Sequence, residues 1–575
     1  MGRSPGRAPA PGRLDRARRG DDLARRLPPR VGLAAGREPR RGRVRSLGRV
    51  PATGGVPGAR EAEVGIVART LRVGIDTAPR VFDCEQPAGF RDSAGADLVG
   101  SFYDQLTSPR AYLDEHGVSR ADWHRIRPVL AEAWWWSEDG RTCTFRVRAG
   151  VYSEDGNELT AEDARWGWER AFGLRDVGKW VARVSSVQDW EDVEVVDRYT
   201  VAFHLSAPNP ALPRTMAQNT PGLYDTAAVL PHLTEDDPWG KELIGGRSLG
   251  FGPYRLVERD DDGVTIAARG SYWRGRPALG EVRLRRYDSR EEALAGLLAG
   301  EVDLVPNVAS ADLPMIVRPR GGGTRFRLQP ASFSGIALHL DPLAEPLDDP
   351  LVRQAIAHAT PYAAVLGSAF DGRTERWHSW VRSDSPGYDP TSWPYEEDVA
   401  RARELLAASK GAGGFETTLR VLPSDGFDAV AEVVADGLSR IGVRLTLDSA
   451  DLAGEIRGGN AAPIMLRGFP EGRGMRVSDP NYAYVHDWGP GRMRLFPFHY
   501  ENEEFFAALR HLVEAGHGRP WEEAARRLQR LHNADAVLIP LCDIRFYVAH
   551  VAELEGYRWY PDNRLPFAEM RWEGD

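Results

Sequence analysis

The chain has 575 residues, more than a single hydrophobic core normally organises, so two or three lobes are expected. Its hydrophobic fraction of 42% and its 17 tryptophans provide enough apolar surface for sizeable cores. Because no stretch of 18 consecutive apolar residues occurs, the sequence excludes a transmembrane helix within the chain as given.

Charge is divided unevenly along the chain. Residues 1–60 hold sixteen Arg, four acidic residues and no aromatic residue, so this segment carries +12 and, from the total of −9, residues 61–575 carry −21. We expect residues 1–65 to be a disordered Arg/Pro-rich extension, because they offer too little apolar surface to fold. Two alternatives stay open: a misplaced start site that makes the segment foreign to the natural protein, or a functional tail that contacts nucleic acid or an anionic membrane.

Local patterns in the first third predict short strands and a capped helix. The apolar run Leu71–Ile75 and the alternating run Thr142–Val147 both predict strands. Thr160 with an acidic residue three positions later, at Asp163, predicts the start of a helix that continues through Phe172. These features position backbone rather than carry chemistry, so they indicate a scaffold that holds something.

The second half predicts a β-α-β arrangement. Residues 416–422, ETTLRVL, follow a glycine-rich loop and predict a strand. Apolar positions at helical spacing predict a helix over Phe427–Ile441, and the sequence IGVRLTLD predicts the next strand. This order suits a parallel or mixed sheet covered by helices.

Catalytic signatures are missing from the sequence. It contains no G-x-S-x-G, no H-E-x-x-H and no Walker loop, and its thirteen His residues are scattered. The acidic pairs Asp236–Asp237 and Glu396–Glu397 lie in polar, turn-like sequence and are interpreted as solvated charge or helix caps. We therefore expect no enzyme activity, no catalytic residues, no metal site and no cofactor.

The three cysteines have no metal-ligand spacing. Cys143 and Cys542 lie in strand-like or apolar sequence and are expected to be small core residues. Cys84 follows the first strand and could lie near a binding cleft. One disulfide is conceivable if the protein is exported, and this point stays open.

A series of motifs in a fixed order resembles one known family. The run from Leu130 reads LAEAW…SEDG…TFRVRAGV…LTAEDA, and GFGPY follows at residues 250–254. Further matches come in the same order: LAGLLAGEVDLV at 294–305, LDDPLVRQAIAHA at 347–359, PGYDP at 386–390 and YRWYPD at 557–562. Over residues 70 to 572 this order resembles the extracellular solute-binding proteins of family 5, which serve peptide and nickel ABC importers.

The resemblance implies a fold and a lobe organisation. It implies an α/β fold of the periplasmic-binding-protein-like type II class, with two large lobes joined by a hinge plus a small extra lobe. The main lobe is expected at residues 70–335 and 526–575 and contains the small lobe at about 110–240. The second lobe is expected at 336–525.

One motif bears on the ligand. Peptide-binding relatives carry a segment like G-W-x-x-D-x-x-D-P whose first Asp pairs with the peptide ammonium group. The corresponding stretch here is GFPEGRGMRVSDPNY, residues 468–482, in which Asp479–Pro480 fits the end of the motif and Arg476 falls at the ammonium-binding position. A guanidinium there would favour a carboxylate or phosphate. Peptide binding, recognition of an anion and recognition of another, sugar-like ligand all stay open.

Aromatic residues and positions carried over from the family complete the candidate site. Core packing is expected for Trp134–Trp136 and Trp166, whereas Trp377 and Trp380 fit a cleft wall and the surface equally well. The predicted ligand-binding residues are Phe82, Asp83, Asn219, Thr220, Phe333, Trp377, Trp380, Phe469, Arg473, Arg476, Asp479 and Tyr482.

The resemblance also implies a function: capture of an oligopeptide or peptide-like solute by hinge closure, and delivery to an ABC permease in the membrane. A monomer is expected, with a small-molecule or peptide ligand, no nucleic acid, and an extracellular, envelope-associated location. The sequence LAAG at 33–36 is like the end of a lipoprotein signal, but Arg37 stands where the family requires Cys. A cytoplasmic solute sensor of the same fold, or a hydrolase built on it, is the alternative.

Overall fold

The computed structural model describes residues 69–575 except 84, 87–92, 116, 175–177, 179–181, 183, 219, 318–324, 423–425, 450–461, 469–479, 481, 487, 489–499, 516, 517 and 559–564. Residues 67–575 make up one compact unit. The other unit, residues 1–66, lies outside the described residues, and so does the predicted extension. Across the described ranges, none of the helices combines the length and the apolar character needed to cross a membrane.

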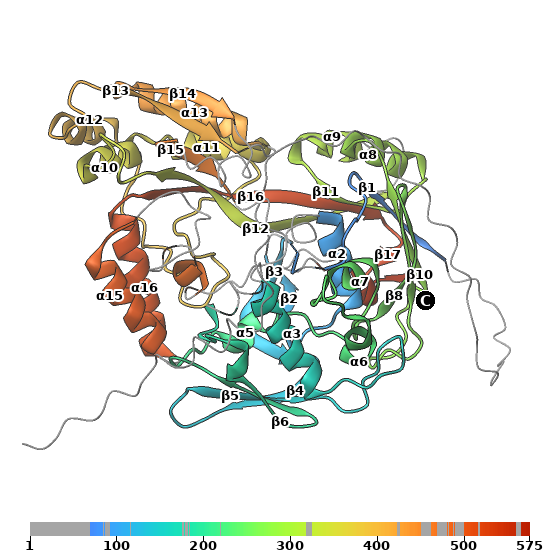
Figure 1. Ribbon diagram of the computed structural model, residues 1–575. Helices are drawn as coiled ribbons and strands as arrows, with labels where there is room; N and C mark the ends of the chain where they lie inside the picture. Colours follow the sequence, from blue (N-terminus) through green and yellow to red (C-terminus); the bar gives the residue numbers. More distant parts are fainter. Residues whose placement is uncertain are drawn as a thin grey trace, which may run out of the picture. The chain divides into compact units, whose positions relative to one another are not determined.

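A mixed sheet of twelve strands organises this unit (Figure 1). Ten strands form a continuous path in the order β14-β13-β15-β12-β16-β11-β1-β10-β9-β8, and β3 joins β12 and β2 beside the path. The strands are β1 (Leu71–Ile75), β2 (Thr107–Leu113), β3 (Ser119–Pro128), β8 (Tyr254–Asp260), β9 (Gly263–Ala268), β10 (Glu281–Arg286), β11 (Leu304–Val308), β12 (Phe326–Leu340), β13 (Phe415–Val421), β14 (Val443–Ser449), β15 (Ile464–Arg467) and β16 (Leu538–Val551).

The two longest strands join the ends of this sheet. β12 has 15 residues and β16 has 14, and they pair antiparallel from Phe326↔Val551 to His339↔Leu538. Two register shifts interrupt the pairing, between Ser332 and Gly335 and between Ile336 and Ala337. Figure 1 shows both strands running from β11 and β1 at one end to β15 at the other. The middle of this strand pair is therefore the place where the ladder is locally irregular.

Parallel β-α-β units lie on either side of the long strands. β10 and β11 both pair parallel with β1, and α8 (Arg290–Ala299) connects them and packs on β1 and β11. β13 and β14 are also parallel and are connected by α13 (Phe427–Ser439). Parallel neighbours need such a crossover. The strands and the helix predicted from residues 71–75 and 416–449 are confirmed, and the predicted mixed sheet is confirmed as well.

A second sheet of four strands lies apart from the large one (Figure 1). Its order is β4-β5-β7-β6, all antiparallel, with β4 (Ala131–Trp136), β5 (Thr142–Val147), β6 (Val193–Asp197) and β7 (Thr200–His204). Helix α3 (Ala161–Leu174) packs on β6 and β7. The predicted cap is present, because the backbone N–H of Thr160 donates to Asp163 Oδ2 at 2.6 Å. These elements share their own apolar cluster, which contains Phe145, Trp168 and Phe203.

Further helices pack on strands of the large sheet, on α3 or on one another. Two of them, α15 (Glu503–Glu514) and α16 (Arg519–Ala534), pack against each other, and α16 also contacts β16. The others are α2 (Ser93–Phe102), α5 (Leu212–Thr215), α6 (Thr226–Val229), α7 (Lys241–Gly246), α9 (Leu313–Val317), α10 (Pro350–Ala359), α11 (Tyr362–Ser368) and α12 (Val399–Ala407).

Several predictions of burial and capping can be scored on this fold. Cys143 and Cys542 are fully buried with free thiols, which confirms the core assignment, whereas Cys84 lies outside the described residues. Asp237 caps α7 by accepting from the backbone N–H groups of Lys241 and Glu242, as expected for a helix cap. Trp166 is in the core, but Trp135 is 48% exposed, so the core assignment is wrong for that residue. The reason is the strand period of two, which turns Trp135 to the opposite face of β4 from Trp134 and Trp136.

A substitution at Gly335, in the irregular middle of β12 and β16, tests how tightly this region is packed. A Cβ added at Gly335 would meet ring atoms of Trp377 at 2.1 Å, whereas one added at Gly367 in α11 would meet nothing within 4 Å. We expect Gly335→Ala to lower the free energy of unfolding by about 1–3 kcal/mol, because Trp377 is held in a buried cluster and cannot move aside freely. The control Gly367→Ala should be neutral or stabilising by up to about 1 kcal/mol. Denaturant unfolding of both variants measures this, and equal stabilities would contradict it.

Candidate ligand-binding site

One buried arginine organises the loop that follows β1. Arg170 on α3 donates from Nη2 to Asp83 Oδ2 at 2.5 Å and from Nη1 to Glu85 Oε2 at 2.7 Å. All three side chains are completely buried. Gln86 adds a hydrogen bond from its Nε2 to Asp83 Oδ2 at 2.8 Å. The described part of the loop after β1, residues 81–83, 85 and 86, is therefore held in place by a guanidinium that is out of contact with water.

The same cluster fixes a second loop. The backbone N–H of Gly222 donates to Glu85 Oε1 at 3.0 Å, and Arg170 Nη1 donates to the hydroxyl of Tyr224 at 3.1 Å. Arg170 Nε donates to the carbonyl of Trp239 at 2.8 Å. One arginine thus connects α3, the loop after β1 and the segment 220–224, which are far apart in sequence. A buried ion pair of this kind specifies loop positions at a high desolvation cost.

The electrostatics of this cluster single out Glu85. Burial raises the pKa of the Glu85 carboxyl to about 7, and the nearby Asp83 adds to the rise, whereas Arg170 and the N–H of Gly222 oppose it. The cluster has two carboxyl groups for one guanidinium, so full ionisation would leave one negative charge in the interior. Protonation of Glu85 near neutral pH removes that charge.

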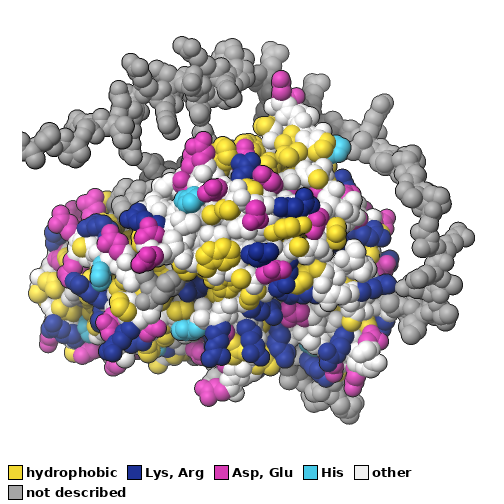
Figure 2. Space-filling model, turned by 90° about the horizontal axis from the view of Figure 1, so that it is seen from below, with side chains coloured by type: hydrophobic (Ala, Val, Ile, Leu, Met, Phe, Trp, Pro, Cys, Tyr) yellow, Lys and Arg dark blue, Asp and Glu magenta, His cyan; other side chains and the backbone are white. Residues whose placement is uncertain are grey.

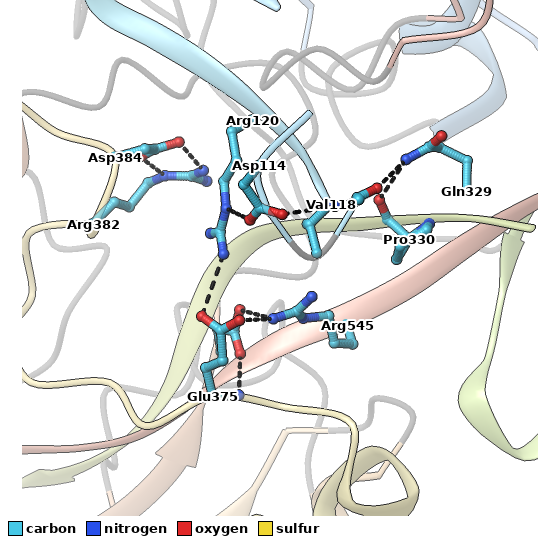
Figure 3. Close-up of polar contacts among 11 residues, drawn as sticks. Asp114, Val118, Arg120, Gln329, Pro330, Glu375, Arg382, Asp384 and Arg545 are labelled. Atoms are coloured by element: carbon cyan, nitrogen blue, oxygen red, sulfur yellow. Dashed lines mark hydrogen bonds and ion pairs between the residues drawn. The ribbon is translucent and has the colours of Figure 1, made fainter. Parts of the chain in front are cut away.

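A second polar network lies beside the middle of the long strands (Figure 3). Its members come from the β2–β3 hairpin, from β16 and from the loop around residue 375. Arg120 on β3 donates from Nε to Asp114 Oδ2 at 2.9 Å and contacts Glu375 Oε2 at 3.3 Å. Arg545 on β16 donates to Glu375 Oε1 at 2.8 Å. The hairpin is held against β12 because Gln329 Nε2 donates to the carbonyl of Gly117 at 2.7 Å.

The structure brings together only some of the predicted site residues. Phe82, Asp83 and Thr220 lie in the two loops tied by Arg170, and all three are buried, so in this structure they support the loops rather than form an open wall. Thr220 lines a cavity of about 10 Å³, the space of one water molecule. Their contact with ligand stays a prediction.

Trp377 and Trp380 lie elsewhere. They belong to a separate apolar cluster under α15 and α16, and they are only 6% and 5% exposed. The surface alternative is therefore wrong for both residues, because they lie in a buried apolar cluster, and their contact with ligand stays a prediction. Asn219, Phe469, Arg473, Arg476 and Asp479, together with the side chains of Phe333 and Tyr482, lie outside the described residues.

Sequence reasoning missed the charged residues that organise both networks: Glu85, Arg120, Arg170, Glu375 and Arg545. Arg170 had a usable signal, because it lies one helical turn after the buried Trp166 on the apolar face of α3. The other residues have no local signal, because their partners are distant in sequence. Among the described residues, no group of three or more His, Cys, Asp or Glu side chains could hold a metal ion.

Comparison with known proteins identifies the class to which this fold and these loops belong. The sequence profile of the bacterial extracellular solute-binding proteins, family 5 Middle, matches residues 125–490, well over half of the chain. The chain belongs to this family of extracellular solute-binding proteins. The predicted resemblance is confirmed.

Individual relatives agree with this assignment. The glutathione-binding protein GsiB of Salmonella typhimurium is 25% identical over 457 residues, which cover 77% of this chain and 85% of GsiB. Among solved structures, HbpA2 from Haemophilus parasuis has a TM-score of 0.72 at 21% identity, covering 88% of this chain and all of HbpA2. DppA from Helicobacter pylori, a periplasmic binding protein in complex with the peptide STSA, has a TM-score of 0.71 at 20% identity, covering 88% and 98%. The predicted periplasmic-binding-protein-like type II fold is thereby confirmed.

The raised pKa of Glu85 predicts a pH-dependent stability. The folded pKa of about 7 exceeds the ordinary value of 4.5, so the folded state holds the Glu85 proton more tightly than the unfolded state does. The contribution of this group to stability is therefore fully present below pH 4.5 and is lost as the pH rises through 7. The group accounts for a loss of up to about 3 kcal/mol between these limits. We expect Glu85→Gln to reduce the fall in the thermal midpoint between pH 5 and pH 8. Glu416→Gln, on an exposed residue, is the control, and a parallel pH profile in the Glu85 variant would contradict the prediction.

Loss of the buried guanidinium should be far more damaging than loss of an exposed one. Arg170→Met leaves Asp83 and Glu85 without their cation, and we expect it to cost about 3–5 kcal/mol of unfolding free energy. Arg444 pairs with Glu416 at the surface, where both side chains are about 70% exposed, and Arg444→Met should change stability by less than about 0.5 kcal/mol. Urea unfolding at pH 7 compares the two, and a similar small loss in both would count against the role of Arg170.

Proposed function

We propose that this chain is the solute-binding component of an ABC importer, which captures an oligopeptide or peptide-like solute and delivers it to a permease in the membrane. The observation that carries the proposal is membership in the extracellular solute-binding family together with the paired long strands β12 and β16. The same membership supports an extracellular, envelope-associated location. The chain binds its solute and does not transform it.

The ligand class is inferred from relatives and from the loops. GsiB is named as glutathione-binding, and DppA was solved with the peptide STSA. Both ligands are built from amino acids, so a peptide-like solute is the class that these relatives share. Loops held rigidly by Arg170 are suited to such a ligand, because a preorganised site loses less conformational entropy on binding.

The mechanism rests on the two long strands. We propose that residues 70–335 and 526–575, with the small lobe at about 110–240, move against residues 336–525 about the irregular middle of β12 and β16. A ligand that touches both lobes only when they approach favours the closed arrangement by its differential affinity for that state. The permease then distinguishes the liganded from the free protein.

Native mass spectrometry of the full chain, purified gently from cells and then mixed with a pool of short peptides, tests this function. We expect an added mass that disappears on denaturation and fragments into amino acids, and a thermal midpoint that rises with peptide concentration, because ligand binds only the folded state. The denatured chain in the same pool is the control. An added mass of a non-peptide solute, or no peptide that raises the midpoint, would contradict the proposal.

A further inference from the structure

We propose that Arg120 and Arg545 form a subsite for a carboxylate group of the ligand, and that Glu375 occupies this subsite in the ligand-free protein. The inference deepens the proposed function, since it assigns one chemical group of the captured solute to two named side chains. Figure 3 shows the arrangement: Arg120 and Arg545 are both directed at the Glu375 carboxylate, the first from β3 and the second from β16.

The geometry is that of one carboxylate shared by two guanidinium groups. Glu375 Oε2 lies 3.3 Å from Arg120 Nη2, and Glu375 Oε1 lies 2.8 Å from Arg545 Nη2. Each oxygen serves a different arginine, so a free carboxylate placed at the same position would make the same two contacts. Guanidinium–carboxylate contacts of this kind are charge-assisted and directional.

The two arginines of this network are nearly buried, whereas Glu375 is half-exposed. The side chains of Arg120 and Arg545 are 10% and 7% exposed, whereas that of Glu375 is 47% exposed. A guanidinium cannot lose its charge in a protein, so a nearly buried one needs an anion beside it. Solvent reaches Glu375 but hardly reaches the two arginines, so the carboxylate is the part that can leave.

Departure of Glu375 would not strip either arginine of its charge partners. Arg120 keeps Asp114, whose Oδ2 lies 2.9 Å from its Nε, and Arg545 keeps Asp543 at 3.3 Å. Arg545 also has capacity for another acceptor, because its buried Nε has no hydrogen-bond partner among the described residues. The site can therefore exchange one carboxylate for another at little electrostatic cost.

The backbone of Glu375 is anchored independently of its side chain. Its N–H donates to Asp543 Oδ1 at 2.7 Å, and its carbonyl accepts from the N–H of Asp543 at 3.0 Å. Rotation of the Glu375 side chain away from the arginines leaves these contacts intact.

The subsite lies at the middle of the long strands. Arg545 is paired with Ser332 of β12 at their irregular middle, which is where the proposed lobes meet. Tyr112 and Leu113, both over 40% exposed, precede Asp114 and offer apolar surface next to the charge.

Chemical rescue tests the subsite without knowledge of the natural ligand. Glu375→Ala in the full chain should lower the thermal midpoint, and acetate should restore at least half of that loss where sodium chloride at equal ionic strength does not. Glu416→Ala is the matched control, because it removes an exposed carboxylate from Arg444 and should show no specific effect of acetate. Adding Arg545→Met to Glu375→Ala should abolish the rescue. A response to acetate equal to that of the control variant would overturn the proposal.

A second arm uses peptides that bind the wild-type chain, each as the free acid and as its C-terminal amide. We expect the free acid to bind roughly tenfold more tightly, Arg545→Met to remove that preference, and Glu375→Gln to strengthen binding of the free acid only. Equal affinities of acid and amide would overturn the subsite while leaving peptide capture intact. If no peptide binds but acetate rescues Glu375→Ala, the proposed function fails and the carboxylate subsite stands.

Discussion

The antiparallel pairing of β12 with β16 is the interaction on which the rest of the described fold depends. It is the only connection within the sheet path between the strands β13–β15 at one end and β1 and β8–β11 at the other, as far as the described residues show. The β2–β3 hairpin also attaches to the sheet at β12, through Ala331 and Ser119. Without this pair, the two β-α-β units would have no shared backbone ladder, and the loops around Glu375 and Asp114 would have no common platform.

Charge is used in two different ways around this platform. In the Arg170 cluster all three charged side chains are excluded from solvent, and Arg170 holds loops whose residues lie 54 to 87 positions from it in sequence. In the network around Glu375, by contrast, the Glu375 side chain is half-exposed. An ion pair loses hydration on burial, so exchanging partners within the buried Arg170 cluster would cost much free energy, whereas a half-exposed carboxylate can return to water. Arg170 thus holds loops in place, whereas Arg120 and Arg545 are placed to exchange one carboxylate for another.

Local sequence patterns were enough to predict much of the secondary structure. Leu71–Ile75 and Thr142–Val147 are strands over the predicted residues, and the Thr160 signal begins α3. These segments carry their information within a few residues, as alternation, helical period or a cap. Trp135 shows the limit, since a run of three aromatic residues suggests burial, but the pleat of β4 exposes the middle one.

The candidate site was far less accessible to such reasoning. Glu375 lies 255 residues from Arg120 and 170 from Arg545, so no local pattern connects them. The sequence leaves open whether Trp377 lies at a cleft wall or at the surface, and its burial against Gly335 is a contact that only the packing of β12 reveals. The resemblance to a family compensated in part, because it identified the loops after β1 and around residue 220, which Glu85 and Gly222 indeed join.

The exchangeable carboxylate has a consequence for affinity. A ligand carboxylate that displaces Glu375 gains the two arginine contacts, but the same two contacts of Glu375 are lost. The net gain in binding free energy is therefore smaller than it would be if the two arginines had no carboxylate between them. Glu375, however, recovers hydration as it leaves, because nearly half of its side chain is already exposed. A neutral group offered to the same position would leave two nearly buried cations with less compensating charge, which is costly. An internal carboxylate therefore lowers absolute affinity while it preserves discrimination against neutral groups, and this combination suits a protein that must release its solute after capturing it.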